Sequence, residues 1–562
     1  AAATAPAAAT ADLAEPPART VIVGGGPAGL ATAIALARRG WRGIQVYDRL
    51  SEPPDPDDEV VFSETARFYL VGIGGRGQRA LRSLGVWDEV LKYANPVVGR
   101  RDWAPGAGPD EGVERIAKDK PYTTQVLARD RLAGVLLRVA RERYGDAVSV
   151  SYGVECDGAS WPAGAPEAAR LRLRRCRQPA EGESCEVEGE PFEESAPLLV
   201  AADGAARVIA DSLEAEEKLG LPLWQRPRRF RVTRFVDDNM RVYKTVPMKL
   251  PAGWRGDINY SARTKDGRIV FDALPADAHG NYCGVLLLRK DDALSQPNTP
   301  PAELRAALDD ALPQFSRLVP DDVLAQIAQK PPSFLPSFRF VGPRLHHGSS
   351  TVLLGDAIHT VKPYFGLGAN SALEDVTEFD AALDAAKGDV GEGLRLFTER
   401  RAGEAEALVR ISRGFDRPGV LGLLTFVVPL VLDAICSKAA PKIFSPNTIS
   451  MLQVPEMTFR GVIRRKRRDR ALQALLLTLA LGGSAAAAAA ALRGCGCLQP
   501  CPKCEGRGFC HSSSKAGRYH NAAPGERCYF CTDCDACSGS GARLLGGAEA
   551  VGAAAAAAAG AE

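Results

Sequence analysis

A glycine-rich turn near the start of the chain has the spacing needed to hold a dinucleotide. Gly24, Gly26 and Gly29 follow the apolar run TVIV and precede a helical pattern. Glycine at these positions permits a tight turn and a close approach of the backbone to a pyrophosphate, which the N–H groups of the following helix then face. Asp48 ends the next apolar run, where an acid accepts hydrogen bonds from a ribose, and Arg49 is assigned to the same site.

Two further motifs lie much later in the sequence. Asp203 and Gly204 follow the apolar run PLLVA, and Gly355 and Asp356 stand in LLGDA. The segment PYFGLGAN then leads into a helix whose first N–H groups can face an anionic group. The residues that we assign to this cofactor-facing turn are Gly366, Gly368, Ala369 and Asn370.

Three residues around this turn are candidates for a role in catalysis. His359 is either a proton relay or a histidine packed behind the turn, and the sequence leaves both open. Pro363 and Tyr364 are expected to line the substrate cavity. No general base for a phenol can be named from the sequence.

A cysteine-rich segment near the C-terminus has the spacing of a zinc module. Two units of the form C-x-x-C-x-G-x-G are spaced so that paired thiolates can surround a tetrahedral metal ion. The expected ligands are Cys501, Cys504, Cys510, Cys528, Cys531, Cys534 and Cys537. Disulfide bonds are the alternative, favoured if the segment lies in an oxidising compartment.

The elements that must position these residues form an α/β pattern. A strand, glycine turn, helix and strand open the chain, and β-rich runs such as FRVTRFV, RVYKTVPM, GRIVFDAL and YCGVLLL occupy residues 228–290. The nucleotide fold resumes at STVLLGDA, and a long helical stretch covers residues 370–415. The pattern predicts an α/β, Rossmann-like dinucleotide-binding fold with an interleaved β-sheet substrate domain, a helical membrane-prone tail and a small zinc module; that the dinucleotide is FAD is what the family resemblance described below implies.

The expected boundaries follow from shifts in composition. They are a disordered leader at 1–18, an FAD-binding domain at 19–415 with its substrate sheet at about 225–300, a helical or interfacial region at 416–470, a transmembrane helix or linker at 471–492, a cysteine-rich module at 495–541 and an Ala-rich disordered tail at 542–562.

Charge and cysteine usage bound the class of protein. The 70 basic and 68 acidic residues leave a net charge of +2, so no global field attracts nucleic acid. Nine of the 14 cysteines lie between Cys495 and Cys537, and the first 450 residues therefore resemble a reduced intracellular enzyme. The Ala/Pro-rich leader fits either the remnant of a chloroplast or mitochondrial targeting peptide or a plain extension.

An uncharged stretch in the tail predicts membrane association. Residues 471–492 carry no charge and follow the basic segment RRKRRDR, which fits a span with its N-terminal side on the positive face. Half of the stretch is rich in alanine, so a linker or an amphipathic anchor is the alternative.

The motifs Asp203-Gly204 and GDAIHTVKPYFGLGANSALED together resemble the FAD-dependent aromatic hydroxylases, the class A flavoprotein monooxygenases. The resemblance covers about residues 19–415. It implies that Arg129 helps to hold FAD, that Asp203 and Gly204 serve FAD and NAD(P)H together, and that Asp356 contacts the ribityl chain. It also implies hydroxylation of an electron-rich small molecule with O2.

Within that family the segment is most similar to the kynurenine 3-monooxygenase group, in which an arginine matched here by Arg100 binds the substrate carboxylate. A solvated surface arginine is the alternative for Arg100. Leu367 replaces the usual glutamine, and the arginine that follows the Asp-Gly motif is displaced to Arg207. The substrate helix also departs from the group, so the resemblance implies the flavin chemistry more strongly than the kynurenine substrate.

The cysteine-rich segment is similar to the zinc module of DnaJ-type co-chaperones, which allows a second hypothesis for the whole chain. In that hypothesis a membrane-tethered flavin fold acts as a scaffold, and the zinc module binds a protein partner. A third hypothesis is an isoprenoid epoxidase or reductase, which the membrane-prone tail would suit.

Overall fold

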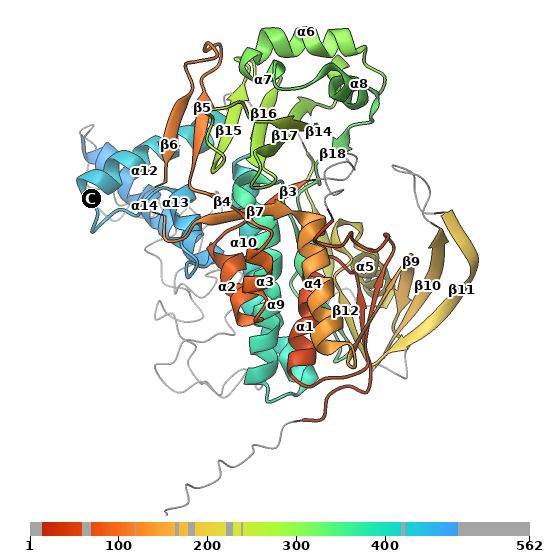
Figure 1. Cartoon of the computed structure of the whole chain (residues 1–562). Helices are drawn as coiled ribbons and strands as arrows, with labels where there is room; N and C mark the ends of the chain where they lie inside the picture. Colours follow the sequence, from red (N-terminus) through yellow and green to blue (C-terminus); the bar gives the residue numbers. More distant parts are fainter. Residues whose placement is uncertain are drawn as a thin grey trace, which may run out of the picture. The chain divides into compact units, whose positions relative to one another are not determined.

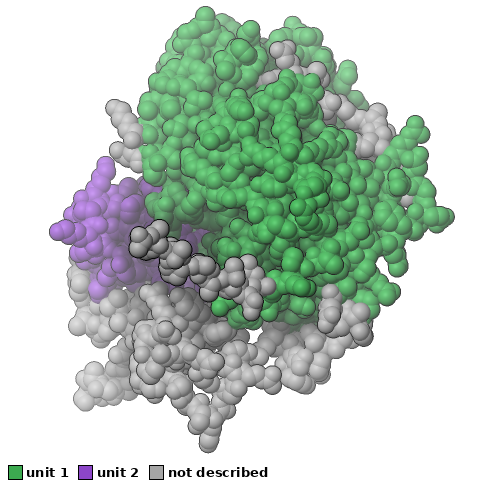
Figure 2. Space-filling view, turned by 60° about the horizontal axis from the view of Figure 1, so that its bottom comes forward, with its two compact units in different colours: residues 1–426, 453–456 green, residues 427–452, 457–562 purple. Residues whose placement is uncertain are grey.

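The computed structural model describes residues 14–58, 69–117, 120–162, 168–177, 186–220, 229–237, 240–417 and 422–480. The chain divides into two compact units, which Figure 2 shows in different colours. Unit 1 comprises residues 1–426 and 453–456, and unit 2 comprises residues 427–452 and 457–562. The cysteine-rich module and the Ala-rich tail lie outside the described residues.

The nucleotide-binding half of unit 1 is built on a six-stranded sheet with the order β20-β21-β12-β1-β2-β8. Its members are β1 (Thr20–Val23), β2 (Ile44–Asp48), β8 (Val148–Tyr152), β12 (Leu198–Ala201), β20 (His346–His347) and β21 (Thr351–Leu353). All neighbours pair in parallel except β20 and β21, which are antiparallel. This confirms the α/β fold that the opening pattern predicts.

Helices pack against this sheet because their apolar residues recur at helical spacing. They include α1 (Pro27–Arg38), α4 (Arg129–Tyr144), α9 (Leu367–Ala385) and α10 (Val390–Gly414), and Figure 1 shows α1, α4 and α9 side by side. Leu30 and Ile34 of α1 are fully buried with Leu373 and Phe379 of α9 in one core cluster. Each such side chain contributes about 1.5–3 kcal/mol on burial.

The interleaved half of unit 1 is a seven-stranded sheet with the order β18-β14-β17-β16-β15-β5-β6. The strands are β5 (Gly99–Trp103), β6 (Val113–Ile116), β14 (Arg241–Lys249), β15 (Ile258–Arg263), β16 (Val270–Pro275), β17 (Asn281–Arg289) and β18 (Ser333–Phe334). One face packs on α6 (Pro301–Ala311), α7 (Pro313–Ser316) and α8 (Asp321–Gln329) in a second core (Figure 1). The predicted substrate sheet therefore exists, and residues 99–116 extend it.

One predicted member of that sheet belongs elsewhere. The run FRVTRFV forms β13 (Arg231–Arg234), which pairs with β19 (Arg339–Gly342) in a separate sheet with β22 (His359–Thr360). The prediction that it lies in the substrate sheet is wrong, because a short β-rich run carries no information on its pairing partner. A further small sheet joins β3 (Leu70–Ile73), β7 (Thr124–Ala128) and β4 (Asn95–Val97).

Further strands and helices complete unit 1. Strands β9 (Val154–Ser160), β10 (Ala169–Arg177) and β11 (Glu186–Ala196) form an antiparallel sheet, and the other helices are α2 (Gly75–Ser83), α3 (Trp87–Leu91) and α5 (Val208–Gly220). Cys176 of β10 takes part in a disulfide bond, so the expectation of reduced cysteines in this part of the chain is wrong at that position.

Unit 2 contains α12 (Val428–Ala439), α13 (Thr448–Leu452) and α14 (Phe459–Ala480). The basic segment RRKRRDR lies inside α14, where Lys466 and Arg470 approach the buried carboxylate of Asp433 at 3.1 and 2.8 Å. Within residues 14–480, as far as the structure describes them, no helix is long and apolar enough to cross a bilayer.

Candidate functional site

The glycine turn after β1 is built so that only glycine fits. Gly24 has a φ of +111°, and a Cβ there would lie 2.1 Å from the carbonyl oxygen of Ala202. A Cβ on Gly29 would lie 1.8 Å from the carbonyl oxygen of Gly24. Gly26 caps α1 without a side-chain hydrogen bond, and no acid stands in the first helical turn. The first N–H groups and the positive end of the helix dipole are therefore open to a phosphate.

Asp48 lies beside this turn, as predicted. One carboxylate oxygen accepts the N–H of Gly25 at 2.7 Å and the other accepts the N–H of Leu50 at 2.8 Å. The side chain is half-buried at the end of β2 and keeps lone pairs for a ligand hydroxyl. Arg49 is exposed instead, and its guanidinium lies 3.8 Å from Glu155.

Arg129 brings a positive charge to the same turn. It begins α4, and its N–H donates to the carbonyl oxygen of Tyr69 at 3.1 Å. A Cβ on Gly26 would lie 3.2 Å from Nη2 of Arg129, so the guanidinium stands directly at the turn. Its one carboxylate partner in the described residues is Asp130, at 2.8 Å. The guanidinium can therefore share its remaining donors with a pyrophosphate.

The Asp203-Gly204 motif follows β12, next to β1 in the sheet. Oδ2 of Asp203 accepts the N–H of Ile209 at 3.2 Å, whereas Oδ1 is buried and has no partner in the described chain. Burial raises the pKa of Asp203 to about 6, against the opposing effect of that hydrogen bond. Arg207, fully buried with a φ of +56°, donates to the hydroxyl of Thr360.

The Gly355-Asp356 motif follows β21. A Cβ on Gly355, which has a φ of +62°, would lie 3.2 Å from the Cβ atoms of both Ala28 and Ala372, so this glycine lets α1 and α9 approach each other. Among the described residues, none donates a hydrogen bond to the Asp356 carboxylate. Burial raises its pKa, and nearby positive charges including Arg207 and Arg129 oppose that shift. An acceptor without a donor suits the hydroxyls of a ribityl chain.

The turn before α9 has two consecutive residues in the left-handed region. Phe365 has a φ of +60° and Gly366 has a φ of +64°. Gly366 caps α9 without a side-chain hydrogen bond, and no acid stands in the first turn of the helix. Pro363 and Phe365 are exposed, and Gly368 and Ala369 are half-buried. This N-terminus is therefore a second place where backbone N–H groups are open to a negative charge.

Asn370 ties this turn to a glycine segment that the sequence motifs missed. Its Oδ1 accepts the N–H groups of Gly74 at 2.8 Å and Gly77 at 3.2 Å. Its Nδ2 donates to the carbonyl oxygens of Gly72 at 2.8 Å and Gly366 at 2.6 Å. Asn370 therefore joins the two loops that flank this turn. The glycine run VGIGGRG at 71–77 is the signal in the sequence that points to this segment.

His359 lies in a buried ionic network behind the turn. Its Nε2 is 2.8 Å from Oδ2 of Asp375, which also accepts the N–H of Gly355 at 3.0 Å. Arg401 bonds Oδ1 of Asp375 at 2.8 Å and Glu374 at 3.0 Å, and Glu374 in turn accepts Arg76 at 3.0 Å. The described structure thus gives His359 a position under the motif, with no exposed surface.

The second face of the seven-stranded sheet is partly exposed and polar. The half-buried residues on this face include Tyr243, Asn259, Ser261, Asp272 and Val285. Ala128, the residue before Arg129, is buried in one cluster with Ala276 and with Cys283 of β17. This face of the sheet therefore lies against the start of α4. Desolvation raises the pKa of Tyr69 to about 12.

Arg100 stands on this same face, on β5. Its Nε lies 2.6 Å from Oδ1 of Asp102, and its side chain is 53% exposed. Because this bond uses Nε alone, the other N–H groups of the guanidinium can still bind a carboxylate.

These residues fit FAD when taken together. Two uncapped helix N-termini and Arg129 provide positive charge for a pyrophosphate and for an anionic ring system, while Asp48 and Asp356 provide acceptors for hydroxyl groups. The glycine cradle at Gly24 and Gly29 would be filled by any Cβ. The motif residues come from three distant parts of the sequence and meet at the ends of neighbouring strands, as expected for a nucleotide site in an open α/β sheet.

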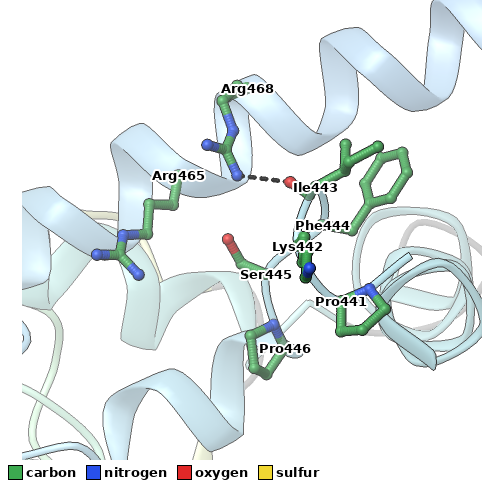
Figure 3. Close-up of a pocket in the computed structure, with 8 residues that line it drawn as sticks. All are labelled: Pro441, Lys442, Ile443, Phe444, Ser445, Pro446, Arg465 and Arg468. Atoms are coloured by element: carbon green, nitrogen blue, oxygen red, sulfur yellow. Dashed lines mark hydrogen bonds between the residues drawn. The ribbon is translucent and has the colours of Figure 1, made fainter. Parts of the chain in front are cut away.

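Other predicted sites lie elsewhere. The seven zinc ligands fall outside the described residues, and the described part of the chain contains no cluster of three metal-binding side chains. Unit 2 has a hollow of its own (Figure 3). It is lined by Pro441, Lys442, Ile443, Phe444, Ser445, Pro446, Arg465 and Arg468, none of which belongs to the flavin motifs.

Comparison with known proteins agrees with this site. The family described as FAD binding domain matches residues 18–412, more than half of the chain. The kynurenine 3-monooxygenase of Xanthomonas campestris pv. campestris (strain 8004) is 26% identical over 402 residues, which cover 70% of this chain and 78% of that protein. Violacein synthase of Chromobacterium violaceum is 25% identical and covers 70% and 84% of the two chains.

Solved structures show the same fold. The tetrameric form of 2-methyl-3-hydroxypyridine-5-carboxylic acid oxygenase has a TM-score of 0.52 at 19% identity and covers 72% of this chain and 95% of that chain. A flavoprotein/dehydrogenase from Cytophaga hutchinsonii also has a TM-score of 0.52, at 16% identity, and covers 83% and 99%. The chain belongs to the FAD binding domain family and is an FAD-dependent oxidoreductase of the monooxygenase type.

Proposed function

We propose that this protein uses NAD(P)H and O2 to hydroxylate an aromatic or other electron-rich small molecule. The observation that carries the proposal is the meeting of the glycine turn, Arg129 and Asp356 opposite a half-exposed polar face of the seven-stranded sheet. The relatives named above as kynurenine 3-monooxygenase and violacein synthase support an aromatic substrate.

The residues of this chain have distinct parts in that reaction. Arg129 and the N-terminus of α1 would hold the pyrophosphate of FAD, and Asp48 and Asp356 would bind its hydroxyl groups. Bound flavin supplies hydride acceptance and the activation of oxygen. The N-terminus of α9 would stabilise negative charge on the ring system, and the packed sheet would keep water away from the reacting atoms.

The substrate is proposed at the level of its chemical class only. Arg100 carries its charge on the same face, and its remaining N–H donors could bind a substrate carboxylate while Nε stays bonded to Asp102. Tyr243, Asn259 and Ser261 on that face could bind hydrogen-bonding groups of the substrate ring.

Zinc, membrane association and a protein partner are further proposals from the sequence alone. Two C-x-x-C-x-G-x-G units and the uncharged stretch at 471–492 support them. A location at the membrane of an organelle would follow from the leader and from that stretch.

The test is a substrate screen with purified protein under air. NADPH and NADH oxidation would be followed with kynurenine, anthranilate, indole derivatives and a phenol, and each product would be analysed by mass spectrometry with 18O2. Hydroxylated product with one 18O atom, formed with stimulated oxidation of NAD(P)H, is expected. A holoprotein whose NAD(P)H oxidation responds to no aromatic compound would contradict the aromatic substrate and favour the scaffold or the isoprenoid enzyme.

A further inference from the structure

A lysine with no exposed surface lies directly before the turn that faces the flavin. Lys362 is 0% exposed, and its Nζ lies 2.9 Å from Oδ1 of Asp237 and 2.7 Å from Oδ2 of Asp416. A buried ammonium is costly unless it is paired with charge. This arrangement therefore depends on both carboxylates, which come from the segment after β13 and from the end of α10.

Asp416 holds the residues on either side of Pro363. Its Oδ2 binds Lys362, and its Oδ1 accepts the hydroxyl of Tyr364 at 2.6 Å. One carboxylate thus fixes two residues of the turn by its two oxygens. Burial and the hydrogen bond to Asp416 raise the pKa of Tyr364, so its hydroxyl stays protonated.

Phe415, the residue before Asp416, also fixes this turn. The ring of Phe415 meets the ring of Phe365 edge to face, with centroids 5.0 Å apart. Phe365 is the aromatic residue at a φ of +60°, a conformation that a bulky side chain adopts only where its surroundings enforce it. Phe415 and Asp416 together provide that enforcement from one side, and Asn370 provides it from the other through the carbonyl of Gly366.

The geometry points to Asp416 and Lys362 as positioning residues that hold the Pro363–Gly366 turn against the isoalloxazine ring of bound FAD. The turn carries both the exposed Pro363 and Phe365 and the uncapped N-terminus of α9. Loosening it would misplace these groups while leaving the pyrophosphate cradle at Gly24 intact. The assignment rests on the proposed flavin chemistry of the same site.

The test compares FAD binding and ring environment in full-length variants. Asp416→Asn and Lys362→Met remove the ion pair, and Tyr364→Phe removes a single hydroxyl, so this last variant is expected to fold in any case. Lys244→Met is the matched control. Lys244 is also a buried lysine, but it faces the helices of the second core and donates at 3.4 Å to the carbonyls of Gln296 and Ala328.

FAD affinity would be measured by titration of the apoprotein, and the ring environment by visible circular dichroism of the bound flavin. Asp416→Asn and Lys362→Met are expected to weaken FAD binding about tenfold and to alter the flavin dichroism, with a several-fold weakening for Tyr364→Phe. In a double-variant cycle, Asp416 and Lys362 should be non-additive. Lys244→Met should lower thermal stability and leave both flavin signals unchanged.

Two results would overturn the inference. One is that Tyr364→Phe and either ion-pair variant both keep the FAD affinity and the flavin dichroism of the wild type. The other is that Lys244→Met changes these two quantities as much as the ion-pair variants do. Failure of the proposed function gives a different result, namely a wild-type holoprotein whose NAD(P)H oxidation responds to no aromatic compound.

Discussion

At the scale of single residues, the flavin site is determined by close approaches that exclude any side chain. A Cβ atom added to Gly24 or to Gly29 would lie about 2 Å from a backbone oxygen. The sequence could predict these glycines, and also Asp48, Gly355 and Asp356, because all stand in short motifs at fixed spacing. It could not predict that Arg100 is paired with Asp102 or that Asn370 bonds to Gly74, because such partners depend on contacts between chain segments.

Gly29→Ala is the sharpest test of the cradle. The new methyl would overlap the carbonyl oxygen of Gly24, and relief of that overlap would distort the turn that faces the pyrophosphate. We expect at least a tenfold loss of FAD affinity and a loss of about 1–3 kcal/mol in the free energy of unfolding.

The control for this variant is Gly414→Ala. Gly414 ends α10, and a Cβ there would meet no atom within 4 Å. FAD titration and urea denaturation of both variants would measure the FAD affinity and the free energy of unfolding. Equal FAD affinity in Gly29→Ala and Gly414→Ala would contradict the role of the glycine turn in binding the pyrophosphate.

Asp203 predicts a specific pH dependence of the apoprotein. Burial raises its pKa from 3.8 to about 6 in the folded state, so folding disfavours the charged form. The free energy of unfolding should therefore fall as pH rises from about 4 to about 6, by at most about 1.4 kcal/mol per pH unit from this group. Asp203→Asn should remove this contribution, and urea titrations between pH 4 and 7 would measure it. An identical pH profile in wild type and variant would refute the assignment.

At the scale of elements, the site depends on three segments that meet although they are distant in sequence. Helix α9, the turn before it and the β3–α2 segment are joined by the hydrogen bonds of Asn370 across about three hundred residues. Hydrophobic periodicity predicted α1 and one helical stretch at 370–415, which the structure divides into α9 and α10, and β-rich composition predicted β14, β16 and β17. Neither could place β13 outside the substrate sheet or add β5 and β6 to it, because strand pairing depends on tertiary contacts.

Asn370→Leu tests the junction of these segments. Four backbone groups would lose their partner in a site where Asn370 is 7% exposed, and each buried unpaired group costs about 1–3 kcal/mol. We expect a marked drop in thermal stability and a loss of flavin on gel filtration. Asn370→Asp, which keeps the acceptor for Gly74 and Gly77 and loses the donor, should be intermediate. Wild-type stability in the leucine variant would contradict the proposed junction.

At the scale of the whole molecule, the family match covers unit 1 and leaves the C-terminal part of the chain to be explained. Residues 18–412 carry the resemblance, whereas the cysteine-rich segment at 495–541 lies beyond it. The alternation of strands and helices was enough to predict the α/β fold of unit 1. Unit 2 contains buried charge at Asp433 and Asp469 that no periodic pattern of apolar residues would reveal.

Metal analysis tests the proposed zinc module in the intact protein. Plasma mass spectrometry should find one to two zinc ions per chain, and Cys501→Ser with Cys504→Ser should lower that number by about one. Flavin content should stay unchanged in the variant, because the module lies outside the matched region. Zinc-free protein with no titratable thiols in the module would instead establish disulfide bonds.

The most direct test of the central claim is the visible spectrum of the purified full-length protein before and after anaerobic addition of NADPH or NADH. We expect a yellow protein with about one FAD per chain, whose visible flavin absorbance is lost with at least one of the two reductants and returns when air is admitted. A colourless protein that cannot be reconstituted with FAD would show that the chain is not a flavin-dependent monooxygenase.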